Sequence, residues 1–427
     1  MELLMNREDF TTSYPPFNVL NTRDKSSLWT KKPINVYVHI PFCSKRCDFC
    51  YYRVEAPKGR DEIQYYVELL LEEIKLMSQL PEFNLYQMNS LYFGGGTPSM
   101  LSEEQIVSIT EAIVALFPKS KDFEFCMEVS PSGGATKAKL ETMKSIGVGR
   151  ISMGLQSLNE QILELNGRNH SKKQFYQAFE RIREAGFDWI NCDIMSGMLG
   201  TTEENWQGTI QELLGLHPEN IAIYKMEVYY NTKLFRKVKE EPALLISNRV
   251  EARHFDEARA VFEDHGYRMS DCFSFISDDK YLHRHRRNLQ NSEEMIGIGL
   301  SSFSYVNGYV YQNTSKMDEY ENMIRNHELP MNRAYKLTQQ DEMVRFIAMG
   351  LKNLHFSRQH FIDRFGVDAS DLFANKIEHL IDKEVLYMND NTLGITSRYY
   401  GYADDIGRFF YPKQHQKSML AHITRED

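Results

Sequence analysis

The run His39-Ile-Pro-Phe-Cys43-Ser-Lys-Arg-Cys47-Asp-Phe-Cys50-Tyr-Tyr52 follows a short apolar, strand-like segment, residues 34–41. Its cysteines have the spacing Cys-x3-Cys-x2-Cys. Three thiolates on one tight loop can bind three irons of a 4Fe–4S cluster and leave the fourth iron open to another ligand. The run therefore predicts a metal site with Cys43, Cys47 and Cys50 as ligands.

Zinc binding and simple structural thiols are the alternatives to a cluster. A zinc site usually needs four ligands, with a second Cys or His pair at a regular spacing. The other cysteines, Cys126, Cys192 and Cys272, are scattered singly. They supply no second pair, which disfavours zinc.

Composition limits the class of protein. The chain has 427 residues, 42% of them hydrophobic, which is enough for two or three domains. A net charge of −9 argues against a broad nucleic-acid surface. The sequence has no apolar run of the length that spans a membrane and no secretory signal at its start, so we expect a cytoplasmic protein with no membrane partner. Few cysteines and an oxygen-labile cluster fit a reducing compartment.

Strand-like and helix-like patterns alternate from residue 34 to about residue 228, with about one strand and one helix every 30 residues. Such units build a parallel sheet. The sequence therefore predicts an α/β fold with a partial (β/α)6 TIM-like barrel, whose chemistry lies at the carboxyl ends of the strands. The expected strands are 34–41, 90–95, 123–129, 150–156, 189–195 and 220–228, and the expected helices are 61–79, 102–117, 136–146, 171–186 and 203–215.

The pattern changes after about residue 236. A long amphipathic helix is expected at 245–266, helices resume near residue 337, and residues 383–396 resemble a hairpin. Helices with a hairpin suggest an α+β, winged-helix-like C-terminal domain. The expected division is a tail wrapping the core (1–33), the barrel core (34–235), a barrel extension with substrate-side elements (236–335) and the C-terminal domain (336–427).

A glycine-rich turn, Gly94-Gly95-Gly96-Thr97-Pro98, follows the second expected strand. Glycines permit close backbone approach, and exposed N–H and C=O groups can meet a zwitterionic ligand. Such a turn is weak evidence alone. Its position one strand and one helix after the cysteine run makes it strong evidence for a ligand site next to the cysteines.

The cysteine spacing and the glycine turn resemble the radical S-adenosylmethionine (SAM) superfamily. In that family the fourth iron binds SAM, and an electron from the cluster cleaves SAM to a 5′-deoxyadenosyl radical. The resemblance implies a radical SAM barrel, a 4Fe–4S cluster and a reducing partner such as flavodoxin or ferredoxin. Further motifs occur in the order found in oxygen-independent coproporphyrinogen III oxidase and its relatives: His39-Ile-Pro-Phe-Cys43, Glu128, Gly154-Leu-Gln156, Asn166-Gly-Arg168, Asp193 and Arg287-Asn-Leu-Gln290.

That resemblance implies two bound SAM molecules. By this resemblance the glycine motif, Gly94 to Gly96, contacts SAM. The carboxylates Glu128 and Asp193 are also expected to contact SAM; the alternative is that each forms a buried ion pair with an arginine such as Arg150. The positions that match the first SAM are Tyr37, Gly95, Glu128, Glu227 and Phe303. Those that match the second SAM are Phe49, Gly96, Thr97, Gln156, Arg168 and Asp193.

Departures from the oxidase pattern bear on the reaction. Tyr51 and Tyr52 replace a Gly-Cys pair, so Cys50-Tyr-Tyr52 is more similar to class C radical SAM methylases and cyclopropanases. The first expectation is therefore C-methylation or cyclopropanation of a small molecule by a second SAM, with Tyr51 and Tyr52 as candidate catalytic or packing residues. Coproporphyrinogen III decarboxylation or other porphyrin or haem radical chemistry is the alternative. A haem chaperone is a third possibility, but the His-Asn…Tyr-Trp motif of such relatives is absent.

His283-Arg-His-Arg-Arg287 is the densest basic cluster. In an acidic protein it can neutralise a carboxylated or phosphorylated substrate. The commoner interpretation of such a charge run is a solvated loop. Metal or haem-iron ligation by its two histidines has little support.

Overall fold

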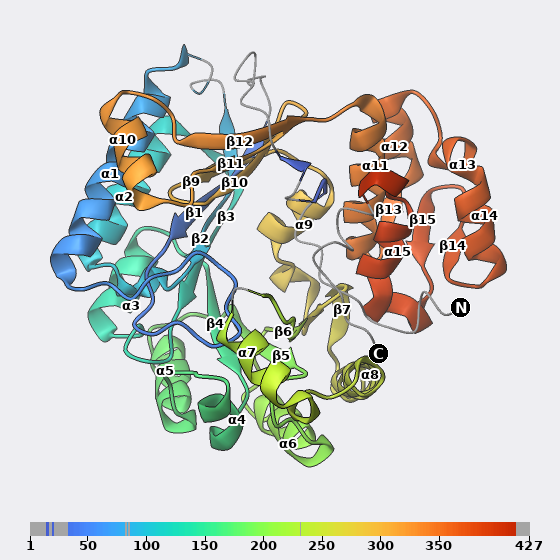
Figure 1. Ribbon diagram of the computed structural model, residues 1–427, viewed down its shortest axis with the longest axis horizontal. Coiled ribbons are helices and arrows are strands. Elements are labelled where there is room, and N and C mark those ends of the chain that lie inside the picture. Colours follow the sequence, from blue (N-terminus) through green and yellow to red (C-terminus); the bar gives the residue numbers. More distant parts are fainter. Residues whose placement is uncertain are drawn as a thin grey trace.

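A curved sheet of parallel strands forms the centre of the computed structural model, which describes residues 14–16, 19–20, 33–81, 83, 86–230 and 232–415. The first six strands lie in the sheet in chain order, each parallel to the next. Helices cover the outer face of this sheet (Figure 1). The partial (β/α)6 barrel is thus confirmed. Its strands are β1 (Pro33–Ile40), β2 (Gln87–Gly95), β3 (Lys119–Val129), β4 (Arg150–Gln156), β5 (Ile190–Ser196) and β6 (Asn220–Lys225).

The covering helices form for local reasons. α2, α5 and α6 each begin with a capping box. The side chain of the capping residue, Ser102, Ser171 or Thr202, accepts a hydrogen bond from the backbone N–H three residues later, and the side chain of that later residue accepts one from the backbone N–H of the capping residue. α1 buries an apolar stripe that includes Ile63, Tyr66, Leu70, Ile74 and Met77, at the three- and four-residue spacing of one helix face. The helices are α1 (Arg60–Ser78), α2 (Glu103–Leu116), α3 (Lys137–Ser145), α4 (Glu160–Leu165), α5 (Lys172–Glu184) and α6 (Glu203–Leu214).

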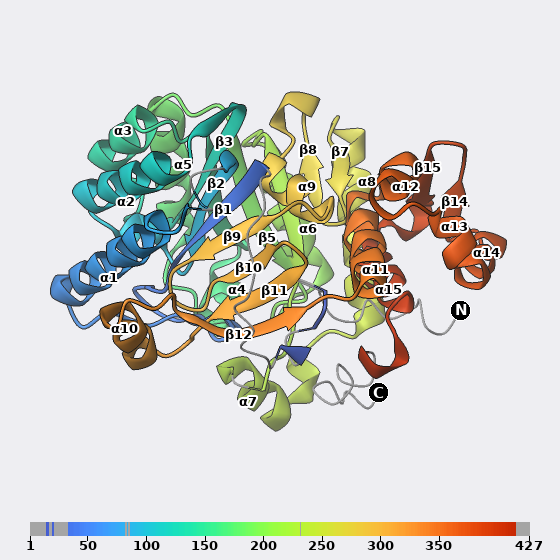
Figure 2. The same ribbon diagram turned by 90° about the horizontal axis from the view of Figure 1, so that it is seen from above.

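Later segments extend the sheet at both edges to twelve strands within the described part of the chain. β9 (Met295–Ile298) is parallel to β1, and β10 (Phe303–Val306), β11 (Tyr309–Asn313) and β12 (Met331–Lys336) continue from it in antiparallel pairs. β8 (Ser274–Ile276) and β7 (Arg268–Asp271) continue from β6 in the same way. Figure 2 shows β10–β12 curving across one end of the barrel. The helices of this region are α7 (Lys233–Glu240), α8 (Asn248–Asp264), α9 (Arg284–Gln290) and α10 (Met317–Arg325).

The last part of the described chain is a helical unit with a small sheet, as expected from the sequence. Its three strands are antiparallel in the order β13-β15-β14, and β14 and β15 form the expected hairpin. Figure 1 shows this unit beside the barrel. Its elements are α11 (Gln339–Gly350), β13 (His355–Ser357), α12 (Arg358–Phe365), α13 (Ala369–Leu372), α14 (Ala374–Asp382), β14 (Leu386–Met388), β15 (Thr392–Ile395) and α15 (Ala403–Phe409). Short 3-10 helices span Pro98–Met100, Pro242–Leu244, Asp279–Tyr281, Leu351–Asn353 and Ser397–Tyr402.

Some expected boundaries differ from the structure. The strand expected over 220–228 ends at Lys225, and α4, α7 and α9 were not expected. Residues 283–287 form the start of a helix, and His283 and His285 are buried. The interpretation of this basic run as a solvated loop is therefore wrong. Most of the expected tail, residues 1–33, lies outside the described residues. The four-part division of the chain remains a proposal.

Tyr14 connects the beginning of the described chain to its end. Its side chain is fully buried, and its hydroxyl donates to Asp341 Oδ1 at 3.0 Å and lies 2.9 Å from His415 Nδ1. Arg345 of α11 donates to the Tyr14 carbonyl at 2.6 Å. The N-terminal segment is therefore fastened to the C-terminal unit.

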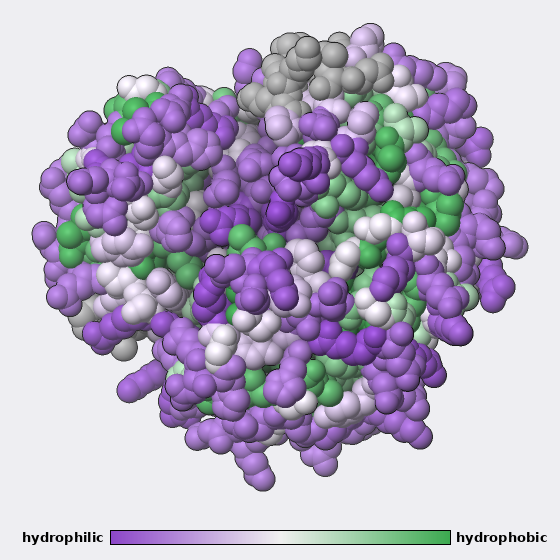
Figure 3. All heavy atoms as spheres, turned by 180° about the vertical axis from the view of Figure 1, so that it is seen from behind, coloured by the Kyte–Doolittle hydropathy of each residue, from purple (hydrophilic) through white to green (hydrophobic). Residues whose placement is uncertain are grey.

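Hydrophilic residues cover most of the face seen in Figure 3. Within the described residues, no helix has the length and apolar character needed to cross a membrane.

Glu73 of α1 is a buried carboxyl that joins the barrel to its extension. It accepts bonds from the Gly299 N–H at 2.8 Å, the Asn313 amide at 2.9 Å and the Tyr320 hydroxyl at 2.5 Å. Burial raises the pKa of Glu73 to about 7, although these three donors partly oppose the rise.

Glu73 makes stability depend on pH. Because its folded pKa lies above its unfolded value, its stabilising contribution is complete in mild acid and declines as the pH rises through about 7. We expect the wild-type free energy of unfolding to fall by roughly 2 to 3 kcal/mol between pH 5 and pH 8 relative to Glu73→Gln. Denaturant titrations at both pH values measure this difference. Glu72→Gln, at the exposed neighbouring position, should match the wild type, and parallel pH profiles for wild type and Glu73→Gln would contradict the assignment.

Candidate functional site

The cysteine loop follows β1 and is held at several backbone points. The Cys43 N–H donates to the Glu55 carbonyl at 2.9 Å, and the Cys50 N–H donates to the Cys47 carbonyl at 3.2 Å. Arg46 closes the loop by donating to the Cys50 carbonyl at 2.8 and 3.1 Å. All three thiols of the loop are free and partly exposed to one cavity.

The glycine turn lies directly beside this loop because β1 and β2 are parallel and in register, with His39 opposite Gly94 and Ile40 opposite Gly95. The Gly96 N–H donates to the Ile40 carbonyl at 2.8 Å, and the Thr97 N–H donates to the Phe42 carbonyl at 2.7 Å. A Cβ at Gly96 would lie 2.5 Å from the Phe42 carbonyl oxygen. Only glycine therefore permits this approach.

A cavity of about 440 Å³ at the carboxyl ends of the barrel strands collects most of the predicted site. Two of the predicted residues lie elsewhere: Gly94 does not line it, and Phe303 lines a second cavity. The predicted residues in its lining are Tyr37, Cys43, Cys47, Phe49, Cys50, Tyr51, Tyr52, Gly95, Gly96, Thr97, Glu128, Gln156, Arg168, Asp193 and Glu227.

Two of the carboxyls that line this cavity come from the barrel strands β3 and β5. Glu128, near the end of β3, accepts a bond from the Tyr92 hydroxyl at 2.7 Å, and burial raises its pKa to about 7. Asp193 on β5 accepts bonds from Asn191 at 2.7 Å and Ser152 at 3.1 Å, and burial also raises its pKa. Among the described residues, neither forms the ion pair with Arg150 that was the alternative role; Arg150 donates instead to Cys126 Sγ at 3.0 Å.

Arg168 contacts the cysteine loop. Its guanidinium donates to Cys47 Sγ at 3.2 Å and to the Gly154 carbonyl at 2.6 Å, while its buried Nε has no hydrogen-bond partner. Gln156 has left-handed backbone with φ 69°, uncommon for a non-glycine residue, and its buried Oε1 is also without a partner. Buried polar atoms seldom stay unpaired, so both atoms suit a polar ligand in the cavity.

Tyrosines line much of the remaining wall. The ring centroids of Tyr51 and Tyr52 lie 4.4 Å apart in a stacked arrangement, and the Tyr229 ring centroid lies 4.4 Å from that of Tyr51. Tyr224 and Tyr229 were not among the predicted site residues. The position of Tyr224 at the carboxyl end of β6 is the sequence signal that identifies it.

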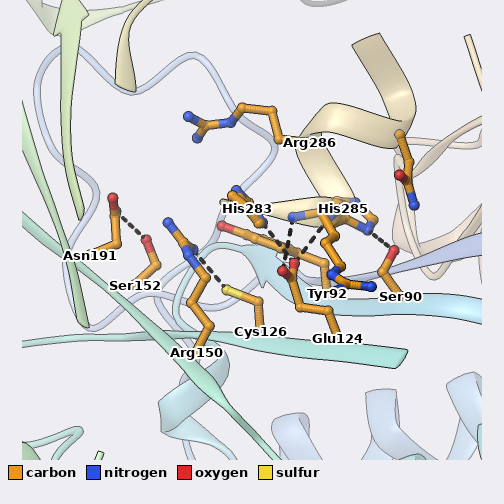
Figure 4. Close-up of polar contacts among 12 residues, drawn as sticks. Ser90, Tyr92, Glu124, Cys126, Arg150, Ser152, Asn191, His283, His285 and Arg286 are labelled. Carbon is orange, nitrogen blue, oxygen red and sulfur yellow. Dashed lines mark hydrogen bonds and ion pairs between the residues drawn. The ribbon is translucent and has the colours of Figure 1, made fainter. Parts of the chain in front are cut away.

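A second cavity, of about 450 Å³, shares Tyr37, Tyr51, Tyr52, Tyr92 and Arg286 with the first. It lies among these residues, α9, the strands β10 and β11 and helix α11. Figure 4 shows His283, His285 and Arg286 around Tyr92 at the start of α9. The basic run at 283–287 thus contributes buried side chains to a cavity wall.

Comparison with known proteins gives the family. The model of the radical SAM superfamily matches residues 37–213. Coproporphyrinogen III oxidase, anaerobic 1, of Cereibacter sphaeroides is 30% identical over 324 residues, covering 72% of this chain and 70% of that protein. The chain belongs to the oxygen-independent coproporphyrinogen III oxidase-like family of radical SAM proteins. It is therefore a radical SAM enzyme by family.

Other relatives extend over more of the chain. The heme chaperone HemW of Bacillus subtilis is 26% identical over 364 residues, which is 85% of this chain and 95% of that protein. The solved structure of Escherichia coli coproporphyrinogen III oxidase, HemN, superposes with a TM-score of 0.82 at 22% identity, covering 94% of this chain and 96% of that one. This likeness shows that the fold, including the C-terminal unit, is shared.

The residues present fit the cluster and SAM that the family implies. Three free thiols face one cavity and can bind three irons. The glycine turn leaves its backbone open beside them, and the unpartnered Gln156 Oε1 and Arg168 Nε offer an acceptor and a donor to a zwitterion. We propose that these residues hold the two groups.

Loss of one thiol should prevent cluster assembly. After anaerobic reconstitution with iron and sulfide, we expect Cys43→Ala to retain less than half of the wild-type iron and to lose the visible absorbance of the cluster. Cys192→Ala, a buried cysteine on β5 outside the cavity, is the matched control and should bind iron normally. Equal iron contents in the two variants would refute the ligand assignment.

Proposed function

We propose that this radical SAM enzyme acts on a porphyrinogen, by oxidative decarboxylation of a propionate side chain or closely related radical chemistry. The observation that carries the proposal is the pair of adjoining cavities, of which only the first contains the cysteines. Each has the size of a ligand pocket, about 300–1,000 Å³. One can hold the cofactor while the other receives a large substrate.

The wall between the cavities suits the aromatic pyrrole rings of a porphyrinogen, which methylene bridges join into a flexible macrocycle. It consists mainly of the tyrosines Tyr37, Tyr51, Tyr52 and Tyr92. Aromatic rings stack on such ligands with offset or edge geometry. The relatives whose names give an activity are coproporphyrinogen III oxidases, which supports this substrate class over the small-molecule methylation first expected.

When bound, the cluster and SAM supply a 5′-deoxyadenosyl radical, which can remove a hydrogen atom from a substrate carbon. The residues of the first cavity orient the cofactor and, with the tyrosine wall, keep water from the radical. The substrate then loses carbon dioxide and one electron, and the electron passes to an external one-electron acceptor. We retain a flavodoxin or ferredoxin as the proposed source of the reducing electron.

Anaerobic incubation of the reconstituted protein with SAM, a reductant and coproporphyrinogen III tests the proposal. We expect 5′-deoxyadenosine to form with one carbon dioxide for each decarboxylated side chain, and product masses to fall by 46 Da per step, the mass of carbon dioxide and two hydrogens. Mass spectrometry follows both. An unchanged substrate, with deoxyadenosine production no greater than without it, would refute the proposal.

C-methylation with a second SAM is the other candidate, because Cys50-Tyr-Tyr52 is similar to the class C methylases. Arg168, Gln156 and Asp193 would serve a second SAM in either reaction. These second-SAM positions line the same cavity as the cysteines. Arg168 can bind a carboxylate through two N–H groups, and Asp193 can accept hydroxyl groups. A methylase would release S-adenosylhomocysteine together with 5′-deoxyadenosine, whereas the decarboxylase would release only the second.

The second SAM position can be tested by stoichiometry. We expect Asp193→Asn to keep a full cluster but to bind about one SAM where the wild type binds two, because an amide oxygen accepts ribose hydroxyls more weakly than a carboxylate does. Equilibrium dialysis with labelled SAM measures the ratio. Asp188→Asn, at an exposed position before β5, should bind as the wild type does. Equal stoichiometry in all three proteins would remove Asp193 from the second site.

A further inference from the structure

The second cavity differs from the first in charge. The first contains Glu128, Asp193 and Glu227, whereas no described residue lining the second is acidic. The lining of the second cavity instead contains Arg53, Arg286, Arg345, His39, His283 and His285. In a chain with a net charge of −9, a cavity of this composition selects for an anion.

His283 brings two ring nitrogens without a hydrogen bond to this wall. It is 6% exposed, and neither ring nitrogen has a hydrogen-bond partner. Glu124 Oε1 lies at an ion-pair distance of 3.5 Å from its Nε2, but the two atoms form no hydrogen bond. The same carboxylate accepts the backbone N–H groups of Arg284 and His285 at 2.8 and 3.1 Å (Figure 4). Burial, reinforced by Arg150 and Arg286, lowers the pKa of His283, so the ring is neutral and holds one N–H to donate.

Two arginines add positive charge to the lining that contains His283. Arg286 is anchored by Ser274, by Tyr224 and, at 3.6 Å, by Asp271. Arg345 lies over the Tyr305 ring at 4.1 Å and is steadied by its bond to the Tyr14 carbonyl. Burial lowers the pKa of Arg345, and Arg364 lowers it further, so a bound anion would relieve an unfavourable charge.

We propose that the second cavity is the carboxylate-binding pocket of the substrate site, in which the His283 ring N–H donates to a substrate carboxylate and Arg286 and Arg345 neutralise its charge. This inference rests on the proposed function, since it assigns the acidic side chains of that substrate to named residues. Placed there, a carboxylate would lie across the tyrosine wall from the cysteines. Its chain would then extend toward the first cavity.

Binding of coproporphyrin III, measured by fluorescence quenching, tests the pocket without turnover. For His283→Phe, which keeps an aromatic ring beside Tyr92 but removes both nitrogens, we expect Kd to rise about tenfold. His283→Gln, which restores a donor and an acceptor, should recover most of the affinity. The uncharged tetraamide of the same porphyrin should bind wild type and His283→Phe equally.

His254→Phe is the matched control. His254 on α8 is also buried with both ring nitrogens without a hydrogen-bond partner, and its ring also lies against an aromatic ring, that of Trp206, but it lines neither cavity. Arg345→Met provides a second variant and should weaken binding at least tenfold. Matching thermal unfolding curves establish that each variant is folded.

The outcomes separate this inference from the proposed function. Turnover of coproporphyrinogen III with equal Kd values for His283→Phe, Arg345→Met and His254→Phe would overturn the pocket and leave the function standing. Weakened binding in His283→Phe and Arg345→Met without any conversion would support the pocket and overturn the function. Failure of the wild type to bind coproporphyrin III would overturn the pocket, and the turnover of coproporphyrinogen III would then decide the function by itself.

Discussion

The close approach of two backbone segments, the start of the cysteine loop and the glycine turn, determines the rest of the site. The Gly96 and Thr97 N–H groups donate to the carbonyls of Ile40 and Phe42, and there is no room for a Cβ at Gly96. These bonds continue the parallel pairing of β1 and β2 beyond the strands. Because the barrel sets that pairing, it also sets where the three thiols face, and every other residue of the first cavity is positioned relative to them.

Much of the fold could be predicted because its signals are local. The strand expected over 150–156 has those bounds in the structure, and α6 begins at the expected Glu203, where Thr202 caps it. The strand expected over 220–228 was too long, because the apolar character that continues to Val228 belongs to residues packed in a separate small core with Leu234 and Met198. Hydrophobicity alone does not distinguish these two forms of burial.

Contacts between segments far apart in the chain explain the parts of the structure that the sequence patterns did not predict. Residues 283–287 have the composition of an exposed loop, yet Glu124, about 160 positions earlier, accepts the first N–H groups of the helix they form. The cavity residues of the barrel followed from strand ends and motif order, as for Glu128 and Asp193. Phe303 matched a motif position but comes from β10, and the antiparallel extension carries it to the second cavity.

The two cavities are lined by different parts of the chain, which bears on how one fold serves relatives with different named activities. The barrel elements supply the thiols, the glycine turn and the acidic residues of the first cavity, all constrained by the β1–β2 approach. The second cavity draws most of its lining from α9, β10, β11 and α11, which come after the barrel strands in the chain. Residues there, such as His283 and Arg345, can change without disturbing the cysteine loop, because none of the backbone bonds that hold the loop involves them. Substrate choice can therefore diverge in this part of the chain while the radical-forming site is kept.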